Sequence, residues 1–460
     1  MSARPAVPKA AVPEAAVTSA PKVASAAEST GSLGDSMYAL VRELYPICRS
    51  ITGNGLRQSL QIIGRRVPLQ ITELPTGSEV LDWTVPKEWN IRAGWIQRLS
   101  GERVIDFERC NLHVLNYSTP VRQRIRRAEL DAHLHSLPEH PDWIPYRTSY
   151  YAETWGFCLS QRQRDALSDD EYEICIDSTL EPGHLTYAEG VLPGTSPQEI
   201  LLTAHVCHPS LCNDNLSGVA VATALLQQLW RQAEKTPPRY TLRVLFIPGT
   251  IGSIAWLAQN RERASRIAHG LSLVCLGDAR PFTYKRTLHG ARDIDRVMAY
   301  ALEASKQPHQ LIDYFPYGYD ERQFNSPGFG LPVGSFMRAQ HGKFPEYHTS
   351  ADDLSFITPE RLEQSLDVCL SVVGILNDNR RYQNLKPFAE PQLGKRGVYP
   401  ALGGGNIADT QLALFWLLAL SDGQHDLLQI ASRSALPFSV IRDAARLLEQ
   451  HELLSAVDTG

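Results

Sequence analysis

Short apolar runs alternate along the chain with longer stretches in which apolar residues recur every three or four positions. Four runs have the length and composition of buried strands: 200–204, 242–247, 271–276 and 333–336. The stretches between them have helical periodicity, as in the segment that follows Asn215. Strands that alternate with helices are typical of a mainly parallel, doubly wound sheet. We therefore predict an α/β core.

The hydrophobic pattern changes before this core is complete. Between residues 69 and 124, short β-like runs are broken by Gly and Pro, which predicts a small β-rich domain. It would be inserted between 35–68 and 125–382, the two parts of the α/β domain. A stretch at 130–137 has helical periodicity. We expect three tryptophans to form the core of the inserted domain: Trp83, Trp89 and Trp95.

The two ends of the chain differ from the middle. Residues 1–34 are rich in Ala and Pro and cannot bury enough surface to offset the entropy of ordering, so they predict a disordered tail. The last part, 383–460, begins with a Pro/Gly-rich linker. It then gives three helices of a winged-helix or helix-turn-helix domain: 410–420, 426–434 and 438–452.

Composition narrows the classes of partner. The chain has 460 residues, of which 43% are hydrophobic and 21% charged, as expected of two or three globular domains. The formal net charge of −5 gives no electrostatic reason to expect nucleic acid. Between Lys395 and Gly460, five Lys and Arg face seven Asp and Glu. We therefore interpret the last domain as a packing, dimerisation or partner module.

The sequence also favours a cytoplasmic protein. No apolar run approaches the roughly 20 residues that span a bilayer, and we find no apolar secretory signal at the N-terminus. The eight cysteines have no CxxC spacing and are expected to be reduced thiols. A homo-oligomer would form through the winged-helix or the inserted domain.

Metal-ligating residues follow the predicted strands. His205 ends the first run, Asp214 lies in the turn before the next helix, and Asp278 follows the third run. Beyond the fourth run lies His348. The carboxyl ends of parallel strands meet at one edge of a sheet, where ligands bind. Imidazole and carboxylate groups suit a divalent metal, so we predict a metal site there.

These motifs, together with the segments 319–334 and 347–352, resemble the co-catalytic zinc aminopeptidases. More closely, the chain resembles a bacterial aminopeptidase-like group labelled as associated with polysaccharide biosynthesis. That group carries an inserted β module, here around 82–90, and a C-terminal winged helix. The resemblance implies a doubly wound mixed sheet and a site with one or two Zn²⁺ ions. His205 and Asp278 would hold one zinc, Asp214 would bridge two, and His348 would hold the second.

The chain departs from the aminopeptidase pattern at two points. After the second core strand, the aminopeptidases have paired glutamates, one a general base and one a metal ligand. This chain has Gly249 and Thr250 there. Two residues after the first His, where those enzymes place an Asp, it has Cys207. A general base typically contributes about 10² to 10⁴ in rate, so its loss needs a replacement or ends catalysis.

Three replacements are open from the sequence. Glu346, beside the second-metal histidine, or Glu321 would act as base or ligand, the alternative for each being a salt bridge or a cap. His208 would join the site and give a single zinc. The third alternative is a site that has lost catalysis. We interpret Cys207 and Cys212 as small buried hydrophobic residues rather than metal ligands.

Further residues are candidates for substrate contacts. Arg322 and Arg338 flank the predicted pocket and would clamp a carboxylate or phosphate, or form ion pairs. Tyr347 adjoins His348. The aromatic segment 144–158 is either a wall of the pocket or a packed linker.

The function predicted from the sequence is a zinc-dependent hydrolase that cleaves an amide bond in a small peptide or aminoacyl conjugate through metal-activated water. The first alternative is an amidase or deacylase in saccharide or secondary-metabolite biosynthesis. The second belongs to a different class: a non-catalytic metal-binding protein that docks a partner through its winged helix.

Overall fold

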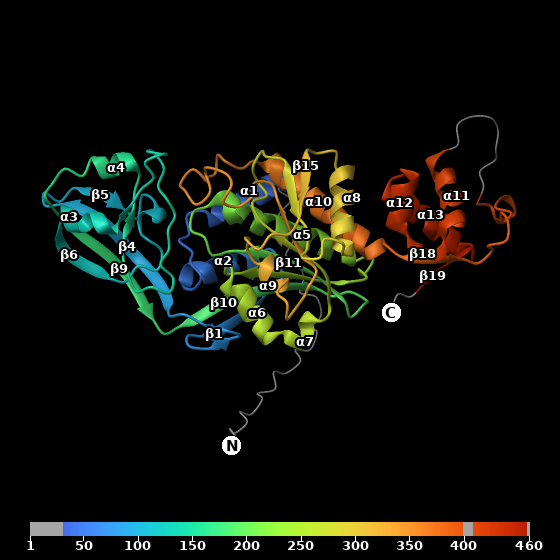
Figure 1. The fold of residues 1–460 in the computed structure, drawn as a ribbon, viewed down its shortest axis with the longest axis horizontal. Coiled ribbons are helices and arrows are strands. Elements are labelled where there is room, and N and C mark those ends of the chain that lie inside the picture. Colours follow the sequence, from blue (N-terminus) through green and yellow to red (C-terminus); the bar gives the residue numbers. More distant parts are fainter. Residues whose placement is uncertain (1–30, 399–407, 458–460) are drawn as a thin grey trace, which may run out of the picture.

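The computed structural model describes residues 31–398 and 408–457. Three parts lie in a row: a small β domain, a central α/β domain and a winged-helix domain at the opposite end (Figure 1). Of the predicted tail 1–34, residues 1–30 lie outside the described residues, and the first helix begins at Leu33. Within the described residues, no helix combines the length and apolar composition needed to cross a membrane.

The central domain is built on an eight-stranded mixed sheet in the order β1-β10-β12-β11-β13-β16-β14-β15. Its four middle strands are parallel, and they confirm the four predicted runs, although the third strand ends at Leu273 rather than 276. The bounds are β1 Gln70–Pro75, β10 His184–Leu192, β12 Thr241–Ile247, β11 Glu199–His205, β13 Ile267–Leu273, β16 Val333–Met337, β14 Phe282–Lys285 and β15 His309–Ile312.

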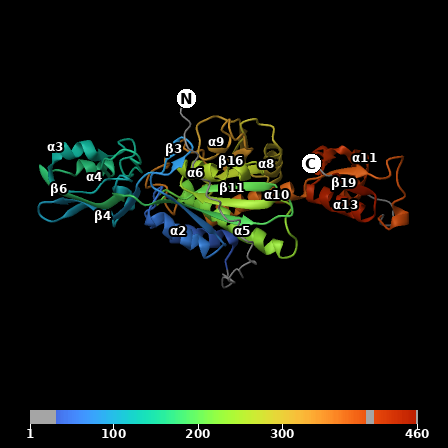
Figure 2. The same ribbon diagram turned by 90° about the horizontal axis from the view of Figure 1, so that it is seen from below.

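Helices cover both faces of this sheet because the middle strands are apolar on both sides. In β11, Ile200 and Leu202 pack into the core beneath one set of helices, and Leu201 packs into the core on the other face. Figure 2 shows α2 and α5 on one side of β11 and α6 and α9 on the other. The helices are α1 Leu33–Leu44, α2 Asn54–Gly64, α5 Gly218–Ala233, α8 Asp293–Ala304 and α10 Pro359–Asp378, then α6 Ile251–Gln259, α7 Arg261–Ala264 and α9 Glu321–Phe324.

The small β domain has different limits from those predicted. Its four-stranded sheet has the order β5-β4-β9-β6, with β4 Glu88–Arg98, β5 Arg103–Asp106, β6 Val121–Arg126 and β9 Glu171–Glu181. The predicted insert 69–124 does not follow this sheet. Its first strand, β1, belongs to the central sheet, and β9 lies far beyond residue 124. Strand partners are set by long-range pairing, which a local pattern does not reveal.

Two smaller predictions for this region need correction. Only Trp89 of the three tryptophans is buried, whereas Trp83 is 39% exposed. The predicted helix 130–137 ends early, because the chain turns into strand β7 at Leu134. The remaining elements of the region are β2 Glu79–Val80, β3 Trp83–Thr84, η1 Asn111–His113, α3 Arg127–Leu130, η2 Asp131–His133, β7 Leu134–His135, β8 Phe157–Cys158 and α4 Gln161–Asp165.

The C-terminal part is a winged-helix domain, as predicted. It contains α11 Asp409–Leu420, α12 Leu427–Ser434 and α13 Phe438–Gln450, and a three-stranded sheet in the order β18-β17-β19. Its strands are β17 Arg381–Asn384, β18 Asp422–Asp426 and β19 Leu454–Val457, and η4 Gly394–Arg396 follows the first of them. The sheet starts at Arg381, slightly before the predicted boundary at 383. The end of the predicted linker, 399–407, and residues 458–460 lie outside the described residues.

Candidate functional site

The site lies at the carboxyl edge of the parallel strands. His205 is the last residue of β11, and the segment η3 (Cys212–Ser217) follows it and leads into α5. Asp214 lies within η3 and is fully buried. Asp352 fixes this segment, because its two carboxylate oxygens accept the backbone N–H groups of Asn213 and Asp214 at 2.6 and 2.9 Å. The sheet edge and Asp352 together hold Asp214 in place.

Three imidazoles surround the Asp214 carboxylate. Nε2 of His205 lies 2.8 Å from Oδ1, and Nε2 of His348 lies 3.0 Å from Oδ2. Nε2 of His208 is 3.9 Å from the same Oδ2. Burial acts to raise the pKa of Asp214, but the three histidines hold that pKa well below its ordinary value. The carboxylate is therefore ionised.

The atoms of this cluster fit a divalent cation. Single ligand atoms of His205, His208 and Asp214 lie within 4.8 Å of one another. Oδ2 of Asp214 and Nε2 of His348 contact each other at 3.0 Å, and neither atom has a hydrogen-bond partner besides this contact. Buried polar atoms that converge without a partner are costly unless a further group satisfies them. Two nitrogens and a carboxylate oxygen at such spacing suit zinc.

His348 is the exposed member of the cluster. Its side chain is 31% exposed, whereas those of His205 and Asp214 are fully buried. Its backbone has φ +56°, in the left-handed region. His348 is therefore the member of the cluster that lies nearest the surface, although its Nε2 is itself buried.

Asp278 is not brought into this cluster. Its Oδ2 accepts hydrogen bonds from the Asn213 amide at 2.8 Å and from the backbone N–H of Ala339 at 3.1 Å. Its Oδ1 accepts the N–H of Arg280. Strand β13 ends at Leu273, before Asp278, and these hydrogen bonds give the Asp278 carboxylate a supporting role.

Neither predicted glutamate is free to act as a base. Glu321 is fully buried, and Nζ of Lys285 lies 2.5 Å from its Oε1. Its Oε2 accepts the N–H of Tyr319 at 3.0 Å. Glu346 pairs with Arg280 at 3.1 Å near the surface. For both, the salt-bridge alternative describes the structure.

The predicted substrate residues have different surroundings. Arg338 is buried, and burial lowers its pKa to about 10. Its guanidinium lies 4.0 Å from the centre of the Phe282 ring and donates to Gln364, so it braces the fold. Arg322 is exposed. Tyr347 is in the site, because its ring stacks on His348 at 3.9 Å.

Tyr319 and Asp320 have roles that the sequence did not reveal. The Tyr319 ring stacks on His205 with 4.1 Å between ring centres, and its hydroxyl lies 3.0 Å from Nε2 of His208. Oδ1 of Asp320 accepts the N–H of Thr250 and the hydroxyl of Ser253, both at 2.9 Å. Asp320 thus contacts the turn after β12, where the resemblance would have placed glutamates. The only signal for either residue was its place in the segment 319–334.

The aromatic segment 144–158 contacts the site. The Tyr146 ring packs edge-on against His208 and His348, with centres 5.2 and 5.1 Å apart. The N–H of Tyr146 donates to the carbonyl of His348 at 2.7 Å, and Ser350 bonds the backbone of Ile144. Of the two alternatives left by the sequence, these contacts fit a wall of the site.

Cys207 takes part in the site without a free ligand atom. Its sulfur accepts the N–H of Gly249 at 3.1 Å and lies 3.4 Å from Nδ1 of His208. Burial raises the pKa of the thiol to about 12, so it stays protonated. It fixes the ring of His208 to the turn after β12. Cys212 is also buried, with a thiol pKa well above its ordinary value because of burial.

Comparisons with known proteins agree with this fold. Residues 38–379 match a family described as a domain of unknown function (DUF4910), and residues 380–456 match a winged helix-turn-helix family. A protein of Clostridium acetobutylicum, provisionally named a polysaccharide biosynthesis protein with an aminopeptidase-like domain, is 47% identical over 431 residues. The match covers 94% of this chain and 98% of that protein. The chain belongs to this aminopeptidase-like family.

Solved structures extend the likeness. A crystal structure from Clostridium acetobutylicum, provisionally described as a peptidase, has a TM-score of 0.87 and 47% identity, covering 92% of this chain and 96% of that one. The zinc aminopeptidase BSAP from Bacillus subtilis has a TM-score of 0.54 and 14% identity, covering 74% and 94%. At that identity the likeness shows the fold alone. The aminopeptidase-like fold with a C-terminal winged helix is thereby confirmed.

Proposed function

We propose that the protein is a hydrolase of amide bonds that uses one zinc ion held by Asp214, His205, His208 and His348. The observation that carries this proposal is the set of three imidazoles whose ring nitrogens converge on one buried carboxylate. The zinc-aminopeptidase fold supports it. A single ion is favoured because Asp278 is engaged elsewhere.

Hydrolysis of an amide needs an activated water and a carbonyl group held in the right orientation. Bound zinc would supply a Lewis acid that polarises a carbonyl group and lowers the pKa of a bound water. The hydroxyls of Tyr319 and Tyr347 lie 3.5 Å apart beside the cluster. Burial raises the pKa of both above the ordinary value, so both keep their protons. They would donate hydrogen bonds to the carbonyl oxygen of a substrate as negative charge develops there.

The engaged glutamates limit the choice of substrate. Without a glutamate base, turnover is expected to be about 10² to 10⁴ times slower than in an enzyme that has one. A reactive or self-assisting amide suits such a site better than an ordinary peptide. The name of the Clostridium acetobutylicum relative favours an aminoacyl or acylamino group on a saccharide precursor. We place such small amides first and free peptides second.

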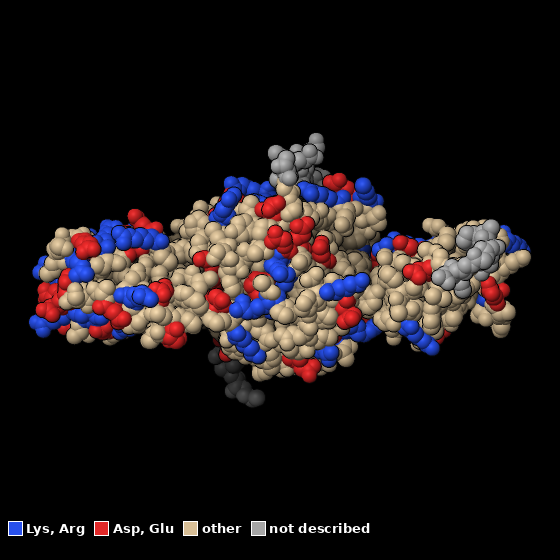
Figure 3. Space-filling view, turned by 90° about the horizontal axis from the view of Figure 1, so that it is seen from above, with Lys and Arg blue, Asp and Glu red and all other residues tan. Residues whose placement is uncertain are grey.

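The second candidate function is metal-dependent ligand binding without turnover. It is favoured by one observation: Glu321 and Glu346 are both paired with cations, Lys285 and Arg280. The winged helix would then serve a partner protein. We propose no DNA role for it, because Arg442 and Arg446 on α13 both pair with Asp378, at 3.4 and 2.8 Å. Lys and Arg side chains are also interspersed with Asp and Glu over the face of the molecule that Figure 3 shows. A mobility shift of duplex DNA at physiological salt would contradict this.

The first test is zinc content per chain by elemental analysis. We expect one zinc in the wild type and a loss in both His208→Ala and His348→Ala. The control is His184→Ala, an exposed residue of β10, which should retain the metal. Two ions in the wild type would overturn the single-metal arrangement. Retention by His208→Ala would remove this residue from the site, and absence of zinc after reconstitution would overturn the metal proposal.

The second test separates catalysis from binding. The loaded wild type is assayed on aminoacyl anilides, which are activated amides, and on N-acylated amino sugars. Turnover that is lost in His348→Ala and kept in His184→Ala supports the hydrolase. Saturable binding of such a compound without turnover, measured by calorimetry, would support the second candidate and overturn the first.

A further inference from the structure

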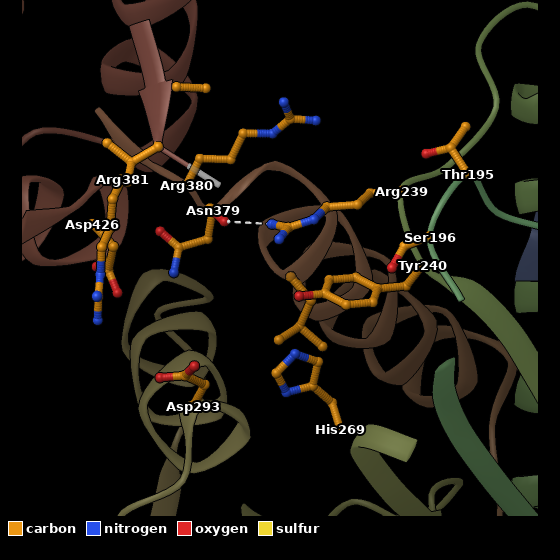
Figure 4. A pocket seen from close by; sticks show the side chains of 13 residues that line it. Thr195, Ser196, Arg239, Tyr240, His269, Asp293, Asn379, Arg380, Arg381 and Asp426 are labelled. Carbon is orange, nitrogen blue, oxygen red and sulfur yellow. Dashed lines mark hydrogen bonds between the residues drawn. The ribbon is translucent and has the colours of Figure 1, made fainter. Parts of the chain in front are cut away.

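A second cavity lies away from the metal cluster, where the α/β domain meets the winged helix. Its volume is about 530 Å³. Residues before β12 and early in β13 line it from one side, and residues of β17 and β19 line it from the other. Figure 4 shows Arg380 and Arg381 on the winged-helix side, with the Arg381 side chain beside Asp426, and Arg239 and His269 on the α/β side. It therefore occupies the amino edge of the parallel strands, opposite the metal cluster.

Guanidinium groups dominate the charge of this cavity. Within the described residues, no ion pair includes Arg239, Arg380 or Arg381. The two acidic residues of the lining, Asp293 and Asp426, are both paired with Arg296, at 2.8 and 2.9 Å. Four guanidinium groups thus meet two carboxylates, which leaves an excess of positive charge.

Arg239 is held in place for a ligand. Its Nη1 donates to the carbonyl of Asn379 at 3.2 Å, and its guanidinium lies 5.0 Å from the centre of the Tyr240 ring. Both contacts orient the group without neutralising its charge. A guanidinium so fixed can offer its remaining N–H groups to an anion with little further loss of entropy.

A buried imidazole adds an independent sign of a ligand. His269 is only 7% exposed, lines the cavity, and its Nδ1 has no hydrogen-bond partner. Buried polar atoms are normally satisfied, so an unpartnered one that lines a cavity points to a group that is bound there. The ring is held edge-on to Tyr240, with centres 5.2 Å apart.

We propose that this cavity binds a small phosphate monoester, gripped by Arg239, Arg380 and Arg381 and hydrogen-bonded to His269. One guanidinium group can donate hydrogen bonds to two phosphate oxygens at once, which makes arginine a common residue in phosphate sites. The volume is within the range of small-molecule pockets and accommodates a sugar phosphate. Because both domains supply arginines, a bound phosphate ties the winged helix to the α/β domain.

The test is calorimetric titration of the full-length protein with glucose 6-phosphate, with glucose as the matched uncharged control. We expect saturable binding of the phosphate ester and none of glucose. Inorganic phosphate should compete. Arg239→Gln and Arg381→Gln should each weaken binding about tenfold or more, because each removes a charge-assisted hydrogen bond. Arg261→Gln, on α7 and outside the cavity, should bind as the wild type does.

Two controls make the result decisive. Each variant is first shown to unfold at the wild-type temperature without ligand and to hold the wild-type metal content, so a lost signal is not a lost fold. No binding of either phosphate compound to the wild type would overturn the proposal. So would binding that survives Arg239→Gln combined with Arg381→Gln, or citrate binding as tightly as the ester. The outcome is independent of any hydrolytic activity.

Discussion

Buried charged groups lie at both ends of strand β11, and they are fully paired at its start but incompletely paired at its end. At its start, Glu199 accepts Arg243 in a two-pronged pair at 2.6 and 3.1 Å, and Arg243 also reaches Glu189 at 3.0 Å. At its end, His205 meets Asp214 in a cluster with unpartnered atoms. The strand is seven residues long, so roughly 20 Å separates the two.

Buried charged groups that hold the fold together can be distinguished here from buried charged groups that would bind a ligand. The Arg243 network is buried, and its strong partners are present within the chain, with the indole N–H of Trp256 also donating to Glu189. Such a network holds the strands together. The Asp214 cluster contains atoms without a hydrogen-bond partner, such as Nδ1 of His205, and the zinc proposed above would complete the cluster. The amino edge has one exception of its own, the arginine cavity.

The largest expected effect is Asp214→Asn. It should lower zinc affinity by more than about 100-fold, because it removes a direct ligand, whereas loss of a supporting residue costs about 10- to 100-fold. Hydrolysis should disappear with the metal. Dialysis against a competing chelator followed by elemental analysis measures this, with urea unfolding to show that the chain still folds. Zinc retained at wild-type affinity would show that Asp214 is not a metal ligand.

Arg243→Met should act in the opposite way. Removing one partner leaves two buried carboxylates uncompensated and should lower the free energy of unfolding by about 3 to 5 kcal/mol. Zinc per folded chain should stay unchanged. Urea unfolding is the measurement, and the matched variant Arg231→Met, exposed on α5, should change stability by no more than about 0.5 kcal/mol. If Arg243→Met changed the free energy of unfolding only slightly and lost zinc, the Arg243 network would not be the purely structural one described here.

His269 extends the contrast to pH. Burial lowers the pKa of His269 from 6.5 to about 4. Between these values the unfolded chain binds a proton that the folded chain does not, so this residue costs stability as pH falls below 6.5 and nothing above it. At pH 5 the cost is about 2 kcal/mol. His269→Gln should therefore lose less stability than the wild type between pH 7.5 and 5, by that amount, in urea unfolding without phosphate. Parallel pH profiles would refute this assignment.

The sequence predicted those parts of the site that a local motif defines. His205 and Asp214 lie nine residues apart at the junction of a strand and a helix, so pattern and motif locate them together. His208 entered only as one alternative, since nothing local shows which way its ring points. Asp278 has the right residue type after the right strand, but a turn moves its carboxylate to Asn213. The α/β core was predictable for the same reason as the first pair.

What the sequence could not show depends on partners distant along the chain. Glu321 looks like a base until Lys285 is placed beside it. The predicted limits of the inserted domain were wrong because β9 pairs with β4 across a long loop, and β1 pairs with β10 in the other sheet. The arginine cavity combines residues of two domains and has no local motif at all.

Substitution of Glu346 has the smallest expected effect, and it tests whether an ion pair with a distant residue keeps this glutamate out of catalysis. By its position beside Tyr347 it is the natural replacement for the missing base, which would make Glu346→Gln cost about 10² to 10⁴ in rate. In the structure it pairs with Arg280 at 3.1 Å, with both side chains partly exposed. Such a pair contributes about 0 to 1 kcal/mol to stability.

We therefore expect Glu346→Gln to keep wild-type zinc content and hydrolysis within about twofold, because a group held by a surface ion pair has no part in the proton transfer. Steady-state rates on the same activated amide, with Arg280→Gln as the matched partner variant, measure this. If Arg280→Gln instead raised the rate and Glu346→Gln abolished it, Arg280 would be restraining a working base. The carboxyl edge would then hold a complete hydrolytic site, and the slow turnover proposed for it would be wrong.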